Sequence, residues 1–187
     1  MANSDKIKIN ILCGTNRPGS NTRIISQNIL NFVRATGAEA ELTDLLLLPP
    51  EIFEPTSYAE KPAGFAPFAD AVLSSDGLYV VTPEYNGGVP GILKYFIDML
   101  PFPESFEGRP VAFTGLAAGQ WGALRPVEQL QSIFGYRNAH VFPERVFLPR
   151  VSGLLSENGE LEERSAKRLQ KQACNFIAFV KRLKVRH

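Results

Sequence analysis

Histidine and cysteine, which most often ligate metals or act as nucleophile and base, are scarce in this chain. The sequence holds two of each among 187 residues. Neither pair has the spacing of a metal site or of a disulfide framework. Cys13 and Cys174 are predicted to be buried thiols, and His140 is predicted to be structural or exposed to solvent. No nucleophile–base pair is evident from the sequence, which disfavours nucleophilic catalysis by a side chain.

Long apolar runs and an excess of charge of one sign are absent as well. No stretch is long enough to cross a bilayer, and the first residues lack the apolar segment of a secretory signal. The formal net charge is +1, and acidic and basic residues are interleaved after Glu39. This balance disfavours a nucleic-acid or membrane-surface partner. The composition, 44% hydrophobic, predicts a cytoplasmic protein with a single domain over residues 1–187.

Apolar residues repeat with the strand period and the helix period in alternating segments. Strands are predicted at 7–13, 38–45, 77–82, 109–116 and 139–142, and helices at 20–35, 65–75, 90–100, 121–134 and 160–183. The proline-rich segment 46–64 is predicted to be a long packed loop without regular structure. This alternation predicts an α/β fold, a parallel sheet with helices on both faces. Its ligand is expected beyond the carboxyl ends of the strands, where the loops after the first, third and fourth strands converge.

The first of these loops, residues 13–23, is rich in glycine, serine, threonine and asparagine. A turn of this kind between a strand and a helix offers free backbone N–H groups to a phosphate. Arg17 and Arg23 flank the helix start, and no carboxylate occurs between Lys6 and Ala38, so a bound anion would compensate the charge. The spacing differs from that of nucleotide-binding glycine motifs, which favours a small terminal phosphate. The alternative is an ordinary connection in which Ser20 caps the helix and the arginines point into solvent.

The second loop, residues 82–91, combines two prolines and three glycines with one aromatic side chain. Its direction is restricted and its backbone N–H groups are exposed, which suits hydrogen bonding to the edge of a flat heterocycle. The alternative is a rigid turn before the next helix, with Tyr85 half buried for packing.

Residues 14–21 (GTNRPGSN), 83–86 (PEYN) and 90–94 (PGILK) together resemble the NADPH-dependent FMN reductase family, which includes quinone, azo-dye and chromate reductases. The resemblance covers nearly the whole chain in order and spacing. It implies a flavodoxin-like three-layer sandwich with sheet order 2-1-3-4-5 and non-covalent FMN at the carboxyl ends of the strands. Hydride would pass from NADPH or NADH through FMN to a quinone, azo compound, flavin or similar small acceptor, with no catalytic residue of the protein.

The resemblance also implies which residues bind the cofactor. The first loop would hold the phosphate, the second would border the isoalloxazine ring, and the third would approach it. The implied FMN-binding residues are Thr15, Arg17, Ser20, Asn21, Thr22, Pro83, Glu84, Tyr85, Asn86, Gly87, Ala117 and Gly119.

Two segments depart from the family pattern. Residues 95–99 read YFIDM, where many relatives continue with Asn-Ala-Ile-Asp-Trp on a helix that helps build the oligomer interface. The apolar cluster around this segment exceeds what one helix needs for its own core, which predicts a homodimer or homotetramer. That cluster comprises Tyr95, Phe96, Met99, Leu100 and Phe102. In the third loop, where relatives often carry serines and a Gly-Gly pair, this chain has Leu116, Ala117, Ala118 and Gly122-Ala123. Its only tryptophan, Trp121, is interpreted as a packing residue rather than a wall of the substrate site.

Two other functions share the predicted architecture, because a fold does not determine a function. One is a flavodoxin-type FMN electron carrier, and the other is a regulatory flavin-binding module. Carriers are typically strongly acidic so that they can dock basic partners, whereas this chain is nearly neutral, which disfavours the first. No residue of the sequence indicates a preference between NADPH and NADH.

Overall fold

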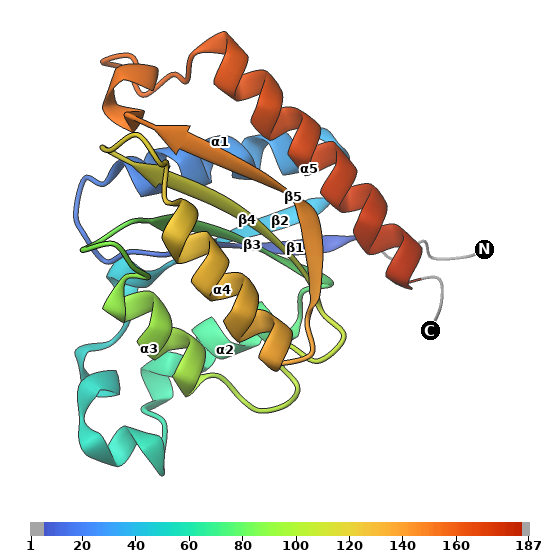
Figure 1. The fold of residues 1–187 in the computed structure, drawn as a ribbon. Helices are drawn as coiled ribbons and strands as arrows, with labels where there is room; N and C mark the ends of the chain where they lie inside the picture. Colours follow the sequence, from blue (N-terminus) through green and yellow to red (C-terminus); the bar gives the residue numbers. More distant parts are fainter. Residues whose placement is uncertain (1–5, 185–187) are drawn as a thin grey trace.

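The computed structural model describes residues 6–184. Its centre is a five-stranded parallel sheet with the order β2-β1-β3-β4-β5, so the predicted strand order is confirmed. The strands are β1 (Lys8–Cys13), β2 (Glu39–Asp44), β3 (Gly77–Pro83), β4 (Pro110–Ala117) and β5 (His140–Pro149). In Figure 1 the arrowheads of β4 and β5 point to the left, and the loops that follow these strands lie at that edge.

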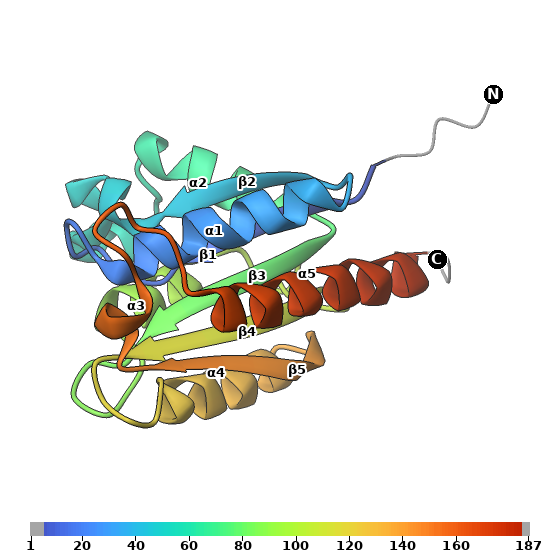
Figure 2. The same cartoon turned by 90° about the horizontal axis from the view of Figure 1, so that it is seen from above.

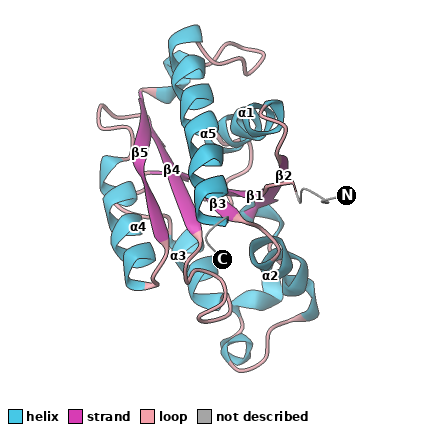
Figure 3. Ribbon diagram, turned by 90° about the vertical axis from the view of Figure 1, so that its right-hand side faces the viewer, coloured by secondary structure: helices cyan, strands magenta, loops and turns pink. Residues whose placement is uncertain are grey.

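Helices cover both faces of this sheet, as predicted. They are α1 (Asn21–Ala35), α2 (Ala66–Leu73), α3 (Gly91–Met99), α4 (Leu124–Tyr136) and α5 (Glu163–Lys184). Helices α1 and α5 lie on one face, and α2, α3 and α4 lie on the other (Figures 1, 2 and 3). Among residues 6–184, no helix is both long enough and apolar enough to span a membrane.

The central strand β3 shows why the chain forms three layers. It is buried along its whole length, and successive side chains point to opposite faces. Tyr79 and Val81 join the core under α1 and α5, whereas Leu78 and Val80 join the core under α3 and α4. A strand that is apolar on both faces is stable only between two helical layers.

A buried polar network ties α5 to the last two strands. The Gln172 amide donates to the carbonyl oxygens of Phe113, at 3.0 Å, and Glu144, at 2.8 Å. Its carbonyl oxygen accepts the hydroxyl of Tyr79, and burial raises the pKa of that phenol above its usual range. These bonds cross the irregularity in the β4–β5 pairing between Val111 and Phe113, where the ladder alone leaves backbone groups without partners.

Several predicted bounds were wrong, among them the start of α5, which is Glu163 rather than 160, and three of the differences from the predictions have local reasons. Strand β5 continues to Pro149 rather than ending at 142, because its ladder resumes beyond the irregularity and Pro143 stands where β4 needs no donor. Helix α4 begins at Leu124 rather than 121, because Gly122 and Ala123 have positive φ angles of 57° and 68°. Segment 46–64 is not free of regular structure, since its prolines begin or precede short 3₁₀ helices.

The prediction for the cysteines was half right. Cys13 is buried, but Cys174 is exposed. Helix α5 buries the stripe that includes Ala173 and Phe176, and one residue beyond Ala173 the helix has already turned by about 100° toward solvent. The prediction for His140 is consistent with its exposed position.

Candidate functional site

A cavity of about 400 Å³ opens at the edge of the sheet where β1, β3, β4 and β5 end. Its volume lies within the range of roughly 300–1,000 Å³ that is usual for small-molecule sites. The lining residues come from four segments that follow strands: Arg17, Pro18, Gly19, Ser20, Asn21, Thr22, Pro83, Glu84, Tyr85, Leu116, Ala117, Ala118, Val151 and Ser152.

The first loop passes directly over the end of β3. The N–H of Gly14 donates to the carbonyl oxygen of Val81 at 2.8 Å, and a Cβ at Gly14 would stand 2.8 Å from that same oxygen. Only glycine permits this approach. Gly19 has a φ of 64°, and Ser20 then caps α1 by accepting the N–H of Arg23 at 3.3 Å. The loop therefore presents the N-terminus of α1 to the cavity with no acidic residue in its first turn.

The two arginines of this loop have different surroundings. The Nε atom of Arg23 donates to Asp44 Oδ2 at 2.7 Å, so part of the positive charge predicted to await an anion is already compensated at the end of β2. Arg17 lines the cavity, and its guanidinium contacts no carboxylate among residues 6–184. Among the described residues that line the cavity, Arg17 is the unpaired cation.

The second loop is a tight turn joined to its neighbours on both sides. Tyr85 and Gly88 exchange backbone hydrogen bonds across Asn86 and Gly87, whose φ angles of 51° and 75° suit a two-residue turn of asparagine followed by glycine. The Tyr85 hydroxyl lies 2.7 Å from Thr15 Oγ1 of the first loop. This contact joins the two loops beneath the cavity, because Thr15 is itself buried.

Helix α4 braces the second loop from the other side. The Oε1 atom of Gln129 accepts the N–H of Val89 at 3.0 Å, and Arg125 pairs with Glu84 at 2.9 Å. Glu84 is the only carboxylate among the lining residues, and its side chain is mostly buried. The pair with Arg125 offsets that negative charge at the cavity wall.

The third loop and the connection after β5 complete the enclosure. Gly115 of β4 lies beneath the third loop, where a Cβ would stand 2.6 Å from the carbonyl oxygen of Gly122. The N–H of Arg150 donates to the carbonyl oxygen of Gly119 at 3.1 Å. Val151 and Ser152 then follow as cavity walls.

Eight of the twelve residues predicted to bind FMN line this cavity: Arg17, Ser20, Asn21, Thr22, Pro83, Glu84, Tyr85 and Ala117. The other four lie beside it. Thr15 is buried beneath Tyr85, Asn86 and Gly87 form the exposed tip of the second loop, and Gly119 is exposed at the third. The structure thus brings the three predicted loops together.

Six lining residues were not predicted: Pro18, Gly19, Leu116, Ala118, Val151 and Ser152. The first four lie next to predicted residues within the predicted loops. Val151 and Ser152 were missed because the last strand was predicted to end at 142. Residues 145–149 read RVFLP and do not alternate between polar and apolar side chains, so the sequence gives no periodic signal that would have extended the strand.

The interpretation of Trp121 as a packing residue was wrong, because its side chain is 54% exposed. Trp121 stands at the outside of the turn that ends at Gly122, whose positive φ reverses the chain. Trp121 is also absent from the cavity walls.

The apolar cluster used to predict an oligomer is largely internal. Phe96, Met99 and Leu100 are buried in the core of this chain. Tyr95 is half buried, and its hydroxyl donates to the carbonyl oxygen of Ile52 at 2.6 Å. Only Phe102, 70% exposed, is freely accessible. The cluster therefore serves mainly to hold α3 against the sheet and segment 46–64.

The cavity has two chemically different ends. Around the start of α1 it offers hydroxyls, an amide and the cation of Arg17, and around the second and third loops it offers Pro83, Tyr85, Leu116 and Ala117. Burial is the main cause that raises the pKa of the nearby Cys13 thiol to about 11, so this thiol is protonated at neutral pH. Residues 6–184 contain no group of three His, Cys, Asp or Glu side chains placed to hold a metal ion. The site suits a ligand with an anionic tail and a flat, mainly apolar ring.

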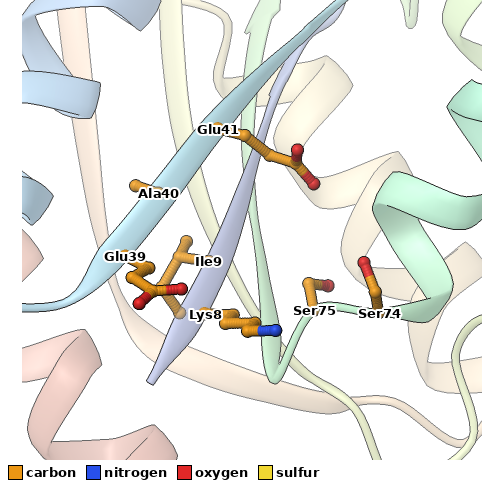
Figure 4. Close-up of a pocket in the computed structure, with 7 residues that line it drawn as sticks. All are labelled: Lys8, Ile9, Glu39, Ala40, Glu41, Ser74 and Ser75. Carbon is orange, nitrogen blue, oxygen red and sulfur yellow. The ribbon is translucent and has the colours of Figure 1, made fainter. Parts of the chain in front are cut away.

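A second hollow, of about 300 Å³, lies at the opposite edge of the sheet. Figure 4 shows its residues at the start of β1, on the edge strand β2 and after α2: Lys8, Ile9, Glu39, Ala40, Glu41, Ser74 and Ser75. It contains charges of both signs, and no long loop encloses it. It lacks the separation of polar and apolar ends that marks the first cavity.

A family model described as NADPH-dependent FMN reductase matches residues 7–152. The chain belongs to this family. The predicted class, an FMN-dependent NAD(P)H oxidoreductase with a flavodoxin-like fold, is thereby confirmed, and it fits better than the flavodoxin-type carrier or the regulatory module.

Curated relatives match over almost their full length. The NAD(P)H-dependent FMN reductase PA1204 of Pseudomonas aeruginosa is 28% identical, over 97% of this chain and 99% of its own. A quinone reductase of Escherichia coli K12 is 27% identical, over 97% of this chain and 100% of its own. Among solved structures, the NAD(P)H:acceptor oxidoreductase FerB of Paracoccus denitrificans superposes with a TM-score of 0.76 at 20% identity, covering 94% of this chain and 98% of its own. That likeness supports the fold.

Proposed function

We propose that this protein binds FMN in the cavity at the carboxyl edge of the sheet and uses NAD(P)H to reduce a quinone or a similar small acceptor there. One observation carries the proposal. The loops that hold two of the three family motifs, residues 14–21 and 83–86, line one cavity with a cationic, hydroxyl-rich end and an apolar end. Residues 1–187 act in this proposal as one FMN-binding domain.

The residues present fit the cofactor. The start of α1 lacks acidic residues in its first turn, and its N–H groups favour a phosphate. Arg17, Ser20, Asn21 and Thr22 would hold that phosphate. The residues that would border the ring are Pro83, Glu84, Tyr85, Asn86, Gly87, Ala117 and Gly119, with Thr15 supporting Tyr85 from below.

Bound FMN would supply the redox chemistry, since its ring can accept a hydride and pass electrons on. The protein would bind and orient the reactants. The hydroxyl of Tyr85 is engaged by Thr15, so the position of the Tyr85 ring is restricted at the cavity wall. Glu84 is held by Arg125, so this carboxylate is drawn away from the anionic cofactor.

The electron donor and the acceptor follow from the named relatives. The Pseudomonas aeruginosa protein is named for NAD(P)H and FMN, the Escherichia coli protein for quinone, and a Bacillus relative, 27% identical over 84% of this chain and 83% of its own, is an NADPH azoreductase. We propose a quinone as the first acceptor to test. Assembly as a homodimer or homotetramer and a cytoplasmic location, both expected from the sequence, complete the proposal.

An anaerobic visible spectrum of the purified protein, reconstituted with FMN, tests the function. Addition of NADPH should bleach the flavin absorbance, and addition of 1,4-benzoquinone should restore it. NADH is run in parallel to measure the donor preference. The Lys8→Ala variant, which changes the hollow at the opposite edge, should behave as the wild type.

Each failure of this experiment has a definite meaning. A flavin that stays oxidised with both NADPH and NADH would contradict the enzyme and favour an electron carrier. A flavin that is reduced but not reoxidised by the quinone would contradict the acceptor. A protein that binds no FMN would contradict the assignment of the cavity.

A further inference from the structure

The connection between β5 and α5 forms a cavity wall that none of the first three loops supplies. It is anchored at three points. Val151 is 4% exposed and packs in the core, the N–H of Arg150 donates to Gly119, and the Nδ2 atom of Asn21 donates to Ser152 Oγ at 3.2 Å. Ser152 is therefore held beside the first residue of α1.

The bond from Asn21 determines what the Ser152 hydroxyl can do. A serine oxygen can accept and donate at the same time. Because Asn21 supplies the proton of one bond, the proton of Ser152 itself remains free to donate. No group among residues 6–184 accepts that proton in the structure.

The position of Ser152 places this free donor at the cationic end of the cavity. Asn21 directly follows the cap residue Ser20, and Arg17 lines the same cavity. The only lining carboxylate, Glu84, is paired with Arg125 on the second loop. Ser152 is exposed, so solvent accepts its proton when the cavity holds no ligand, and an anionic ligand at this end of the cavity would replace that solvent as the acceptor.

We propose that Ser152 donates a hydrogen bond to the phosphate of the bound flavin nucleotide, with Asn21 orienting its hydroxyl. This inference rests on the proposed function, because it assigns one more ligand within the same cavity. It adds a fourth segment, the β5–α5 connection, to the three loops that hold the cofactor. It also gives Asn21 a positioning role through Ser152.

Titrations of the apoprotein with FMN and, separately, with riboflavin test this assignment, because riboflavin lacks the phosphate. Flavin fluorescence reports binding in both cases. Ser152→Ala should weaken FMN binding roughly tenfold, since hydrogen bonds to charged groups are stronger than neutral ones, and should leave riboflavin binding unchanged. Ser152→Thr, which keeps a hydroxyl, should retain the preference for FMN.

A matched control lies in the same connection. Ser156 Oγ accepts the N–H of Glu160 at 3.0 Å and does not line the cavity, so Ser156→Ala should leave the binding of both flavins unchanged. The thermal midpoints of all the apoproteins show whether a variant is misfolded. If Ser152→Ala is misfolded, flavin binding is compared between Ser152→Thr and the wild type.

The outcomes separate this inference from the proposed function. Equal losses of FMN and riboflavin binding in Ser152→Ala, or no loss of either, would overturn the phosphate contact while leaving the function intact. Absence of FMN binding by the wild type would overturn the proposed function and this contact with it.

Discussion

The two edges of the β-sheet carry hollows of similar size, about 400 Å³ and 300 Å³, with different chemistry. At the carboxyl edge, four segments that follow strands converge, and the start of α1 offers unpaired N–H groups. At the amino edge, Lys8, Glu39 and Glu41 lie on exposed strand ends (Figure 4). The comparison shows that the volume of a hollow does not by itself indicate a binding site. Hydrogen-bond donors that converge on one hollow do indicate one.

Parallel topology is the physical cause of this difference. Every strand points the same way (Figure 1), so the loops that follow the strands share one edge, as do the N-termini of the helices after them. The amino edge receives the C-terminal ends of helices such as α2, whose negative dipole ends do not favour an anion.

Substitution of one buried glycine at each edge should have the largest effect and should show how differently the two edges are constrained. In Gly115→Ala, the new Cβ would stand 2.6 Å from the backbone oxygen of Gly122, so the third loop must move. We expect a loss of about 3 kcal/mol in the free energy of unfolding, at the upper end of the usual range for overpacking, and weaker FMN binding. Urea denaturation and FMN titration measure the two effects.

The matched variant at the amino edge is Gly77→Ala. Its Cβ would meet the side chains of Val180 and Phe176 at 3.1 and 3.2 Å, which can yield more readily than backbone. We expect a smaller loss of stability and unchanged FMN binding. A loss as large as that of Gly115→Ala would contradict the claim that the third loop is the more tightly constrained region.

Removal of one cation at each edge should show that only the cation at the carboxyl edge contributes to FMN binding. Arg17→Ala should weaken FMN binding by about 1.5 to 3 kcal/mol through loss of a charge-assisted contact with the phosphate. Lys8→Ala, at the amino edge, should have no effect. Both variants are titrated with FMN by fluorescence, and unchanged affinity in Arg17→Ala would rule out its role at the phosphate.

The buried thiol of Cys13, just before the first loop, should make the stability of the protein depend on pH. Burial raises the pKa of Cys13 from 9.0 to about 11, so above pH 9 the unfolded chain releases a proton that the folded chain retains. The free energy of unfolding should therefore fall as the pH rises, by about 1 kcal/mol between pH 9 and pH 10. Urea denaturation at several pH values measures this slope.

Two variants test the cause of that slope. Cys13→Ala should reduce it, whereas Cys174→Ala should not, because Cys174 is already exposed in the folded protein. An unchanged slope in Cys13→Ala would contradict the assignment to the buried thiol.

The smallest effect is expected at the ion pair between Arg125 of α4 and Glu84 of the second loop. Arg125 is 54% exposed, so its pair with Glu84 is screened by solvent and should contribute about 0.5 kcal/mol to stability. Arg125→Gln should lower the thermal midpoint slightly and weaken FMN binding mainly at low salt. Gln129→Glu, which keeps the oxygen that accepts the Val89 N–H, is the variant with which Arg125→Gln is compared. Equal effects of Arg125→Gln on FMN binding at low and high salt would contradict an electrostatic role for Arg125.

Most of the fold could be predicted because its signals are local. The continuous burial of β3, whose side chains point alternately to two covered faces, and the apolar stripe of α1 follow directly from the strand and helix periods. The end of β5 could not be predicted in the same way. Pro143 and the polar residues after it interrupt the pattern, and only the pairing with β4 restores the strand.

The site shows the same division. Arg17, Ser20, Asn21, Pro83, Glu84 and Tyr85 could be placed near one cavity from their loops. The partner of Arg23 could not, because Asp44 is 21 residues away and belongs to a neighbouring strand. Phe96 and Met99 were expected at a subunit interface for a similar reason, since only packing shows that this chain buries them itself.

The sequence by itself determined the alternation of strands and helices, the glycine-rich first loop, the rigid second loop and, through short motifs within these loops, the family, because each signal depends on residues close together in the chain. The tertiary structure decided which charges pair, which apolar residues remain exposed and that the β5–α5 connection brings Ser152 to Asn21, 131 residues away along the chain. Contacts over such separations depend on how the layers pack, because no periodicity or turn signal in either segment encodes its distant partner.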